Sequence, residues 1–166
     1  MLRSDPVENE TVLYDWHRRL IKFDKLVRRV DERPAMVWNV DFYQDDAGKV
    51  PVMRWLDTLP EDVRGKVIAR IDLLKMGGPT LDYPYTSQID GRLREIRLRV
   101  GKTRYRVLYF FDEDRTAILL HGLTKNTPAV EETAKGIGRA RMAKHEARFA
   151  SKRSAATRRG RGEGDK

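Results

Sequence analysis

The chain has 166 residues, no cysteine and a formal net charge of +9. The absence of cysteine excludes disulfides, thiolate nucleophiles and zinc sites built on cysteine. No apolar run approaches the roughly 20 residues of a membrane-spanning helix, and the N-terminus lacks the apolar centre of a signal peptide. We therefore expect a soluble cytoplasmic protein with one domain plus tails and no membrane partner.

Composition divides the chain into three regions. Residues 1–37 are polar and charged, residues 38–149 have the mixed composition of a globular domain, and residues 150–166 are rich in Arg, Gly and Ser. The last region has few apolar residues and is expected to be a disordered basic tail. Its charge can add nonspecific attraction for nucleic acid, although a solvated chain end is the simpler interpretation.

Residues 1–37 contain a predicted amphipathic helix. Asp5-Pro6 has the pattern of a helix N-cap followed by proline in the first turn. Apolar residues then recur at alternating spacings of three and four, as Leu13, Trp16, Leu20, Phe23, Val27 and Val30. Such a stripe must be buried, and we favour packing on its own domain over a dimer or partner helix. Met36 is an alternative start of translation, although chance translation rarely produces a regular apolar stripe.

The globular region begins with an alternating strand over residues 38–43. Two helices with one apolar side each follow, and the second begins after Pro60 and ends at Gly77-Gly78-Pro79. A loop then leads to three consecutive strands, and a last helix begins at Thr127-Pro128. The expected bounds are 50–59 and 61–76 for the first two helices, 93–100, 103–111 and 116–124 for the strands, and 127–149 for the last helix.

The order β-α-α-β-β-β-α predicts an α+β domain with a mostly antiparallel four-stranded sheet and helices packed on one face. Alternation along the two central strands separates an apolar face from a basic face. The buried face is expected to hold Ile96, Leu98, Val100, Val107, Tyr109 and Phe111. The open face is expected to hold Arg97, Arg99, Arg104 and Arg106.

The most basic segment is the hairpin between these two central strands. Seven basic residues and one acid lie between residues 92 and 106. Gly101-Lys102 suits a two-residue type II′ turn, which pairs arginine with arginine twice across the strands. Like charges in opposite positions destabilise a sheet, and sequences break such rules at functional sites. A polyanion fits this face, and an RNA backbone is our first interpretation, although basic side chains also serve solubility.

Five segments of the chain follow a recurring pattern. They are Trp38-x-Val40-x-Phe42-Tyr43, Pro51-Val52-x-x-Trp55-Leu56-x-x-Leu59-Pro60, Arg94-Glu95-Ile96-Arg97, Tyr105-Arg106-Val107-Leu108-Tyr109-Phe110, and Leu119-Leu120-His121-Gly122-Leu123-x-Lys125 followed by Thr127-Pro128. In this order they resemble the phage-derived, HigB-like branch of the RelE toxin superfamily, over about residues 37–145. The resemblance implies a RelE-like fold for this part of the chain.

The resemblance also implies a function. It indicates the toxin of a type II toxin–antitoxin module, an endoribonuclease that needs no metal or other cofactor. Such toxins cleave mRNA, typically on the ribosome, and so inhibit translation. It further implies a helix-turn-helix antitoxin of the HigA or Xre type as partner. Position by position, the resemblance assigns the catalytic residues to Arg97, Arg106 and Lys125.

Cleavage of RNA needs a base for the 2′-hydroxyl, stabilisation of the phosphorane charge and an acid for the 5′-oxygen. Arg97 and Arg106, if opposed, can clamp the scissile phosphate, and Lys125 can act as a phosphate ligand or in proton transfer. His121 is a further candidate for catalysis as the base. By alternation it shares a face with Leu119 and Leu123, and a lone histidine in such a place is more often structural.

Further residues are expected to contact RNA or have a weaker claim to catalysis. Glu131 and Glu132 are alternative bases, although acids in a first helical turn are ordinary partners of the helix dipole. The acidic clusters of the chain look like turns, and no metal site is expected. The expected RNA-binding residues are Arg94, Arg99, Lys102, Arg104 and Tyr105.

Departures from the family pattern leave a second function open. Asn126 stands where the family has a second lysine, and a third lysine is missing. Arg94 replaces a common aromatic residue, and Ser87 and Gln88 replace lysines. The alternative is therefore a catalytically weakened RNA-binding protein of the same fold, and a phage structural protein with an incidental basic face is a third interpretation.

Overall fold

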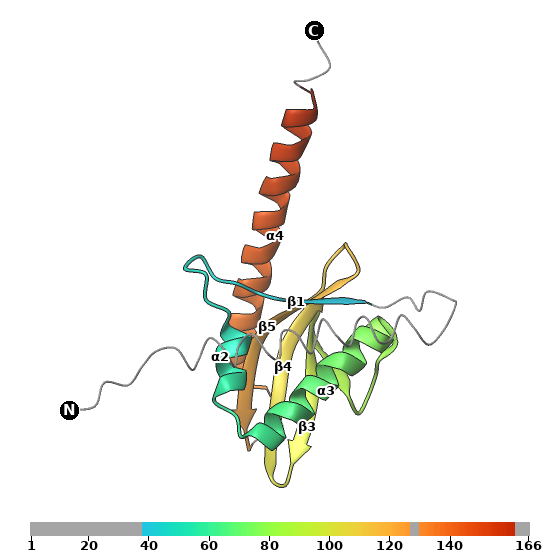
Figure 1. Cartoon of the computed structure of the whole chain (residues 1–166), viewed down its shortest axis with the longest axis vertical. Helices are drawn as coiled ribbons and strands as arrows, with labels where there is room; N and C mark the ends of the chain where they lie inside the picture. Colours follow the sequence, from blue (N-terminus) through green and yellow to red (C-terminus); the bar gives the residue numbers. More distant parts are fainter. Residues whose placement is uncertain (1–37, 127–129, 162–166) are drawn as a thin grey trace, which may run out of the picture. The chain divides into compact units, whose positions relative to one another are not determined.

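The structure, a computed structural model, describes residues 38–126 and 130–161. The helix predicted within residues 1–37 and the Thr127-Pro128 motif lie outside these described residues. The elements in chain order are β1 (Asn39–Phe42), α2 (Pro51–Asp57), α3 (Glu61–Gly77), the short 3₁₀ helix η1 (Gly78–Thr80), β2 (Thr86–Asp90), β3 (Leu93–Val100), β4 (Thr103–Phe111), β5 (Thr116–Lys125) and α4 (Glu132–Arg161) (Figure 1).

The strands form one five-stranded sheet in the order β1-β5-β4-β3-β2. Only β1 runs parallel to its neighbour, and the other pairs are antiparallel. The α+β class and the mostly antiparallel sheet are therefore confirmed, but the sheet has one strand more than the four predicted. The additional strand, β2, was expected to be a loop because Pro84 and Gly91 flank its five residues. It pairs only with the first half of β3.

The β3–β4 hairpin has the predicted register. Val100 pairs with Thr103, and the two arginine pairs face each other as expected. Gly101 has a φ of +60°, and Arg115 is the only non-glycine with positive φ in the part of the chain that the structure describes. Lys102 therefore has negative φ, which fits a type II′ turn and excludes type I′.

The helices cover both faces of the sheet, so the prediction of helices on one face is wrong. A Cβ at Gly122 of β5 would lie 2.1 Å from the Trp55 ring of α2, whereas a Cβ at Gly138 of α4 would lie 3.3 Å from Leu108. Gly122 pairs with Val107, the neighbour of Leu108, so these two contacts lie on opposite faces. The reason is visible in β4, where the consecutive hydrophobic residues Val107–Phe110 are buried, so both faces of the strand need cover.

The arginines of the hairpin consequently share their face with α4. This helix packs on the cluster that includes Leu93, Leu108 and Phe110, at the end of the face away from the β3–β4 turn. Figure 1 shows α4 running away from that turn. The basic end of the face is therefore left uncovered by the helix, and the expectation of an open basic face holds only there.

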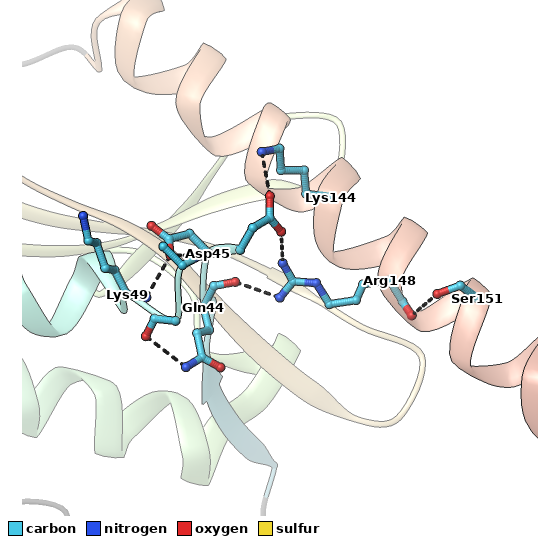
Figure 2. Close-up of polar contacts among 9 residues, drawn as sticks. Gln44, Asp45, Lys49, Lys144, Arg148 and Ser151 are labelled. Carbon is cyan, nitrogen blue, oxygen red and sulfur yellow. Dashed lines mark hydrogen bonds and ion pairs between the residues drawn. The ribbon is translucent and has the colours of Figure 1, made fainter.

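Polar contacts attach α4 to the loop after β1. Arg148 donates from Nη2 to Asp46 Oδ1 at 2.6 Å and from Nη1 to the carbonyl of Gln44 at 2.9 Å, and Lys144 Nζ lies 3.4 Å from Asp46 Oδ2. Figure 2 shows both side chains reaching from α4 toward this loop. The pKa of Asp46 lies below its usual range, mainly because of the hydrogen bond from Arg148.

The C-terminal segment differs from the sequence prediction in one respect. Residues 150–166 were expected to be disordered, but α4 continues to Arg161. Alanine and arginine are strong helix formers, which favours extension of a helix that is already anchored. No helix in the described ranges has the length and apolar character needed to cross a membrane.

Candidate functional site

An open cleft of about 460 Å³ lies beside the tip of the β3–β4 hairpin. β2 pairs with β3 only as far as Ile96, and the next contact is the backbone N–H of Arg97 donating to the carbonyl of Tyr85 at 2.7 Å. The outer edge of β3 beyond this point faces the cleft. Five arginines, two tyrosines, a leucine and a proline line the cleft, and no acid does. The lining residues are Arg70, Tyr83, Pro84, Arg97, Leu98, Arg99, Arg104, Tyr105 and Arg106.

A buried carboxylate organises two of these arginines. Glu95 Oε2 accepts a hydrogen bond from Arg106 Nη1 at 2.8 Å, and Glu95 Oε1 lies 3.6 Å from Arg97 Nε. Ser87 Oγ donates to the same Oε1 at 2.8 Å. The side chains of Glu95 and Arg106 are only 5% and 4% exposed, whereas that of Arg97 is 33% exposed. Arg106 is thus held below the surface, and Arg97 presents charge to the cleft.

Tyrosine rings contact two of the lining arginines. The Arg97 guanidinium lies 5.2 Å from the centre of the Tyr83 ring, and the Arg70 guanidinium lies 4.4 Å from that of Tyr85. Both distances are in the range of cation–π contacts. Arg70 comes from α3, so this helix contributes one arginine to the lining of the cleft.

The predicted site residues divide into those that the structure brings to the cleft and those that it does not. Arg97, Arg99, Arg104, Tyr105 and Arg106 line the cleft, and Lys102 is exposed at the adjoining turn. Arg94 has its side chain on the opposite face by alternation, with its guanidinium 5.8 Å from the Phe111 ring centre. It lines a separate hollow with Gln88, Gly91, Arg92 and Phe111.

Lys125 lies at the rim, where it pairs across the strands with Arg104. Its Nζ is 3.0 Å from Glu131 Oε1, and Arg104 Nη1 donates to the carbonyl of Asn126 at 2.8 Å. Lys125 is therefore next to the cleft but not among its lining residues. An incoming phosphate would have to compete with Glu131 for this lysine.

His121 lies on the α4 face, outside the lining of the cleft. Its Nδ1 is 3.1 Å from Arg141 Nη1, and the same nitrogen of Arg141 donates to the carbonyl of Leu120 at 2.8 Å. The pKa of His121 is lower than its usual value of 6.5, mainly because the ring is partly buried and secondly because the charge of Arg141 is close to it. The histidine is thus neutral near pH 7 and is packed under the helix.

This environment predicts a pH dependence of stability. Because the pKa of His121 is lower in the folded state, the unfolded chain binds more protons as the pH falls through about 6.5, and the folded state is penalised. Replacing His121 by Gln removes this penalty. The free energy of unfolding of the wild type is expected to decline relative to that of the variant between about pH 7.5 and about pH 5. A difference that stays constant over this window, measured by urea denaturation, would contradict the assignment.

Sequence reasoning missed two groups of cleft residues. Arg70 belongs to a helix whose buried stripe was recognised, but nothing in its spacing indicated which strand it would face. Tyr83 and Pro84 lie in a segment that the sequence predicts only as a loop. Glu95 was noted as the single acid of the hairpin, and its place on the arginine side of β3 could have identified it as their partner. Within residues 38–126 and 130–161, no three potential metal ligands lie together.

Comparison with known proteins tests the family resemblance independently. The family model described as "Phage derived protein Gp49-like" matches residues 54–143, more than half of the chain. The chain is also 41% identical over 73 residues to the protein named "Putative toxin HigB3" of Mycobacterium tuberculosis (strain ATCC 25618 / H37Rv), over 43% of this chain and 64% of that protein. The match thus spans less than two thirds of the relative's length. This chain therefore belongs to the phage-derived Gp49-like family, and its predicted resemblance to HigB-like toxins is confirmed.

Proposed function

We propose that this chain is the toxin of a type II toxin–antitoxin module and acts in the cytoplasm as an endoribonuclease that cuts mRNA, in association with the ribosome. The observation that carries the proposal is the cleft lined by five arginines at the hairpin tip. The similarity to a protein named as a HigB toxin supports the same function. A helix-turn-helix antitoxin is the partner that we expect to neutralise it.

The proposed reaction is an internal phosphoryl transfer. The 2′-oxygen of one nucleotide bonds to phosphorus and the bond to the 5′-oxygen of the next nucleotide breaks, which leaves a 2′,3′-cyclic phosphate and a 5′-hydroxyl. Arg97 is the arginine that we expect to contact the scissile phosphate, because it is partly exposed and forms an ion pair with the buried Glu95. Guanidinium groups that stabilise developing charge make the largest contribution to such a reaction.

Arg106 has a different expected part in this scheme. Its side chain is almost fully buried beside Glu95, so direct phosphate contact would require displacement of the carboxylate. We therefore expect Arg106 to support the position of Glu95 and, through it, Arg97. Lys125 remains a candidate phosphate ligand at the rim.

A second function is favoured by specific contacts. Arg106 is engaged by Glu95 and Lys125 by Glu131, and Asn126 occupies the place of a family lysine. These features are those of a catalytically weakened chain that binds RNA without cutting it. Such a chain would bind RNA in a salt-sensitive manner and would not arrest growth.

Induction of the chain in a bacterial host distinguishes the two functions. The wild type is expected to arrest growth and to produce cut mRNA, whereas Arg97→Ala is expected to reduce cleavage by about 10²–10³-fold and to relieve the arrest. Arg54→Ala is the matched control, because Arg54 is exposed on α2 outside the cleft. Growth that continues with soluble wild-type protein would favour the RNA-binding alternative. Arrest by Arg97→Ala at equal expression would place the activity outside the cleft.

A further inference from the structure

The rim of the arginine cleft carries one aromatic side chain that packing does not explain. Tyr83 is 73% exposed, whereas the other exposed rings in the part of the chain that the structure describes, Tyr85 and Phe149, are each 37% exposed. The Arg97 guanidinium lies over its ring, 5.2 Å from the ring centre. A ring in this state contributes little to a core, and its exposure suggests a ligand.

The segment around Tyr83 is nevertheless held in place. The backbone N–H groups of Tyr85 and Thr86 donate to the carbonyl of Asp82 at 3.0 and 3.3 Å, and Thr86 Oγ1 donates to the carbonyl of Leu81 at 2.5 Å. Thr86 itself is fully buried. The ring is therefore presented by a fixed turn, which reduces the entropy lost when a ligand stacks on it.

From this placement we propose that Tyr83 is a nucleobase-stacking residue: a base of single-stranded RNA stacks on its ring while the adjoining phosphate is bound by Arg97. The proposal rests on the proposed function of the cleft. Single-stranded nucleic acids are bound by charged grooves that track the backbone, with aromatic rings that receive the bases. Arg97 lies at the Tyr83 ring and also in the phosphate-binding cleft, so one residue joins the two parts of the site.

The arrangement favours RNA over a protein partner. Tyrosine and arginine are also frequent in protein interfaces, but those interfaces place them around an apolar centre. Here five arginines line the cleft beside the ring, and Leu98 and Pro84 are its only aliphatic lining residues. A polyanion with planar groups matches this chemistry better than an apolar protein surface.

The test uses two oligomers that share a backbone but differ in their bases. One is a 2′-O-methyl oligoribonucleotide, which lacks the nucleophile and cannot be cleaved, and the other is its abasic counterpart. At constant low salt, Tyr83→Ala is expected to weaken binding of the first about 5- to 100-fold and to leave binding of the second unchanged. Tyr83→Phe, which keeps the ring, should bind both like the wild type.

Each other outcome overturns a specific part of the inference. If Tyr83→Ala weakens both oligomers equally, the ring acts only by positioning Arg97. If it weakens neither while the wild type binds RNA, the stacking proposal fails and the proposed function stands. Loss of neutralisation by the antitoxin with unchanged RNA affinity would assign the ring to a protein partner. If the wild type binds neither oligomer, the proposed function of the cleft fails as well.

Discussion

Replacing Glu95 by Gln is expected to destabilise the protein by about 3–5 kcal/mol, because a buried arginine then loses the carboxylate that neutralises it. Glu95 and Arg106 are each about 5% exposed or less and are joined by a 2.8 Å hydrogen bond. The amide has nearly the shape of the carboxylate, so the loss measures charge and not packing. Chemical denaturation gives the free energy of unfolding directly.

The matched control is Glu146→Gln on α4. Glu146 also pairs with an arginine, Arg92, but both side chains are exposed, and such a pair contributes less than about 1 kcal/mol. A loss for Glu95→Gln as small as that of the control would show that the buried pair does not stabilise the fold. The double variant Glu95→Leu/Arg106→Met should recover most of the stability but not the proposed binding of RNA.

A methyl group at Gly122 is expected to cost about 3 kcal/mol, at the upper end of the usual cost of overpacking. The added Cβ would lie 2.1 Å from the Trp55 ring, closer than carbon atoms can approach. Neither partner yields easily, since Gly122 belongs to an interior strand of the sheet and Trp55 Nε1 donates to Thr124 Oγ1 at 3.0 Å. Thermal denaturation of Gly122→Ala should show a large fall in the melting temperature.

Gly136→Ala is the control, and it is expected to raise the stability of the protein instead of lowering it. Gly136 lies in α4 with nothing within 4 Å of the position of its Cβ, so alanine should stabilise by about 0.5–1 kcal/mol. If the clash with Trp55 causes the loss of stability in Gly122→Ala, a smaller residue at position 55 should reduce that loss. The effects of the changes at positions 55 and 122 on stability would then be non-additive. A Gly122→Ala variant as stable as the wild type would contradict the close packing of α2 on β5.

Local sequence signals predicted the elements in which one rule dominates. The Gly101-Lys102 turn determines the hairpin register, because a two-residue type II′ loop permits one pairing. The stripe of α3 was equally clear, and its residues Val63, Val67, Ile71 and Leu74 are buried. The arginines of the cleft followed from that register.

Features that depend on the tertiary arrangement were not predicted. β2 is a short edge strand between chain-breaking residues, and its pairing with β3 compensates for a weak local signal. The second helical layer depends on α4, whose docking relies on long-range contacts such as Arg148 with Asp46. Tyr83 reaches the cleft because the turn that carries it is held against β3, where the backbone N–H of Arg97 donates to the carbonyl of Tyr85. Periodicity within one segment contains no information on such placements.

The central claim is that the arginine cleft is the place where this chain cuts RNA. The most direct measurement is cleavage of a defined mRNA by the purified chain in a reconstituted translation system, with the wild type, Arg97→Ala and the control Arg54→Ala compared by mapping of the RNA ends. The cleft predicts fragments with 5′-hydroxyl ends from the wild type and the control, and about 10²–10³-fold slower cleavage by Arg97→Ala. Equal cleavage by all three proteins, or intact mRNA with folded wild-type protein, would contradict it.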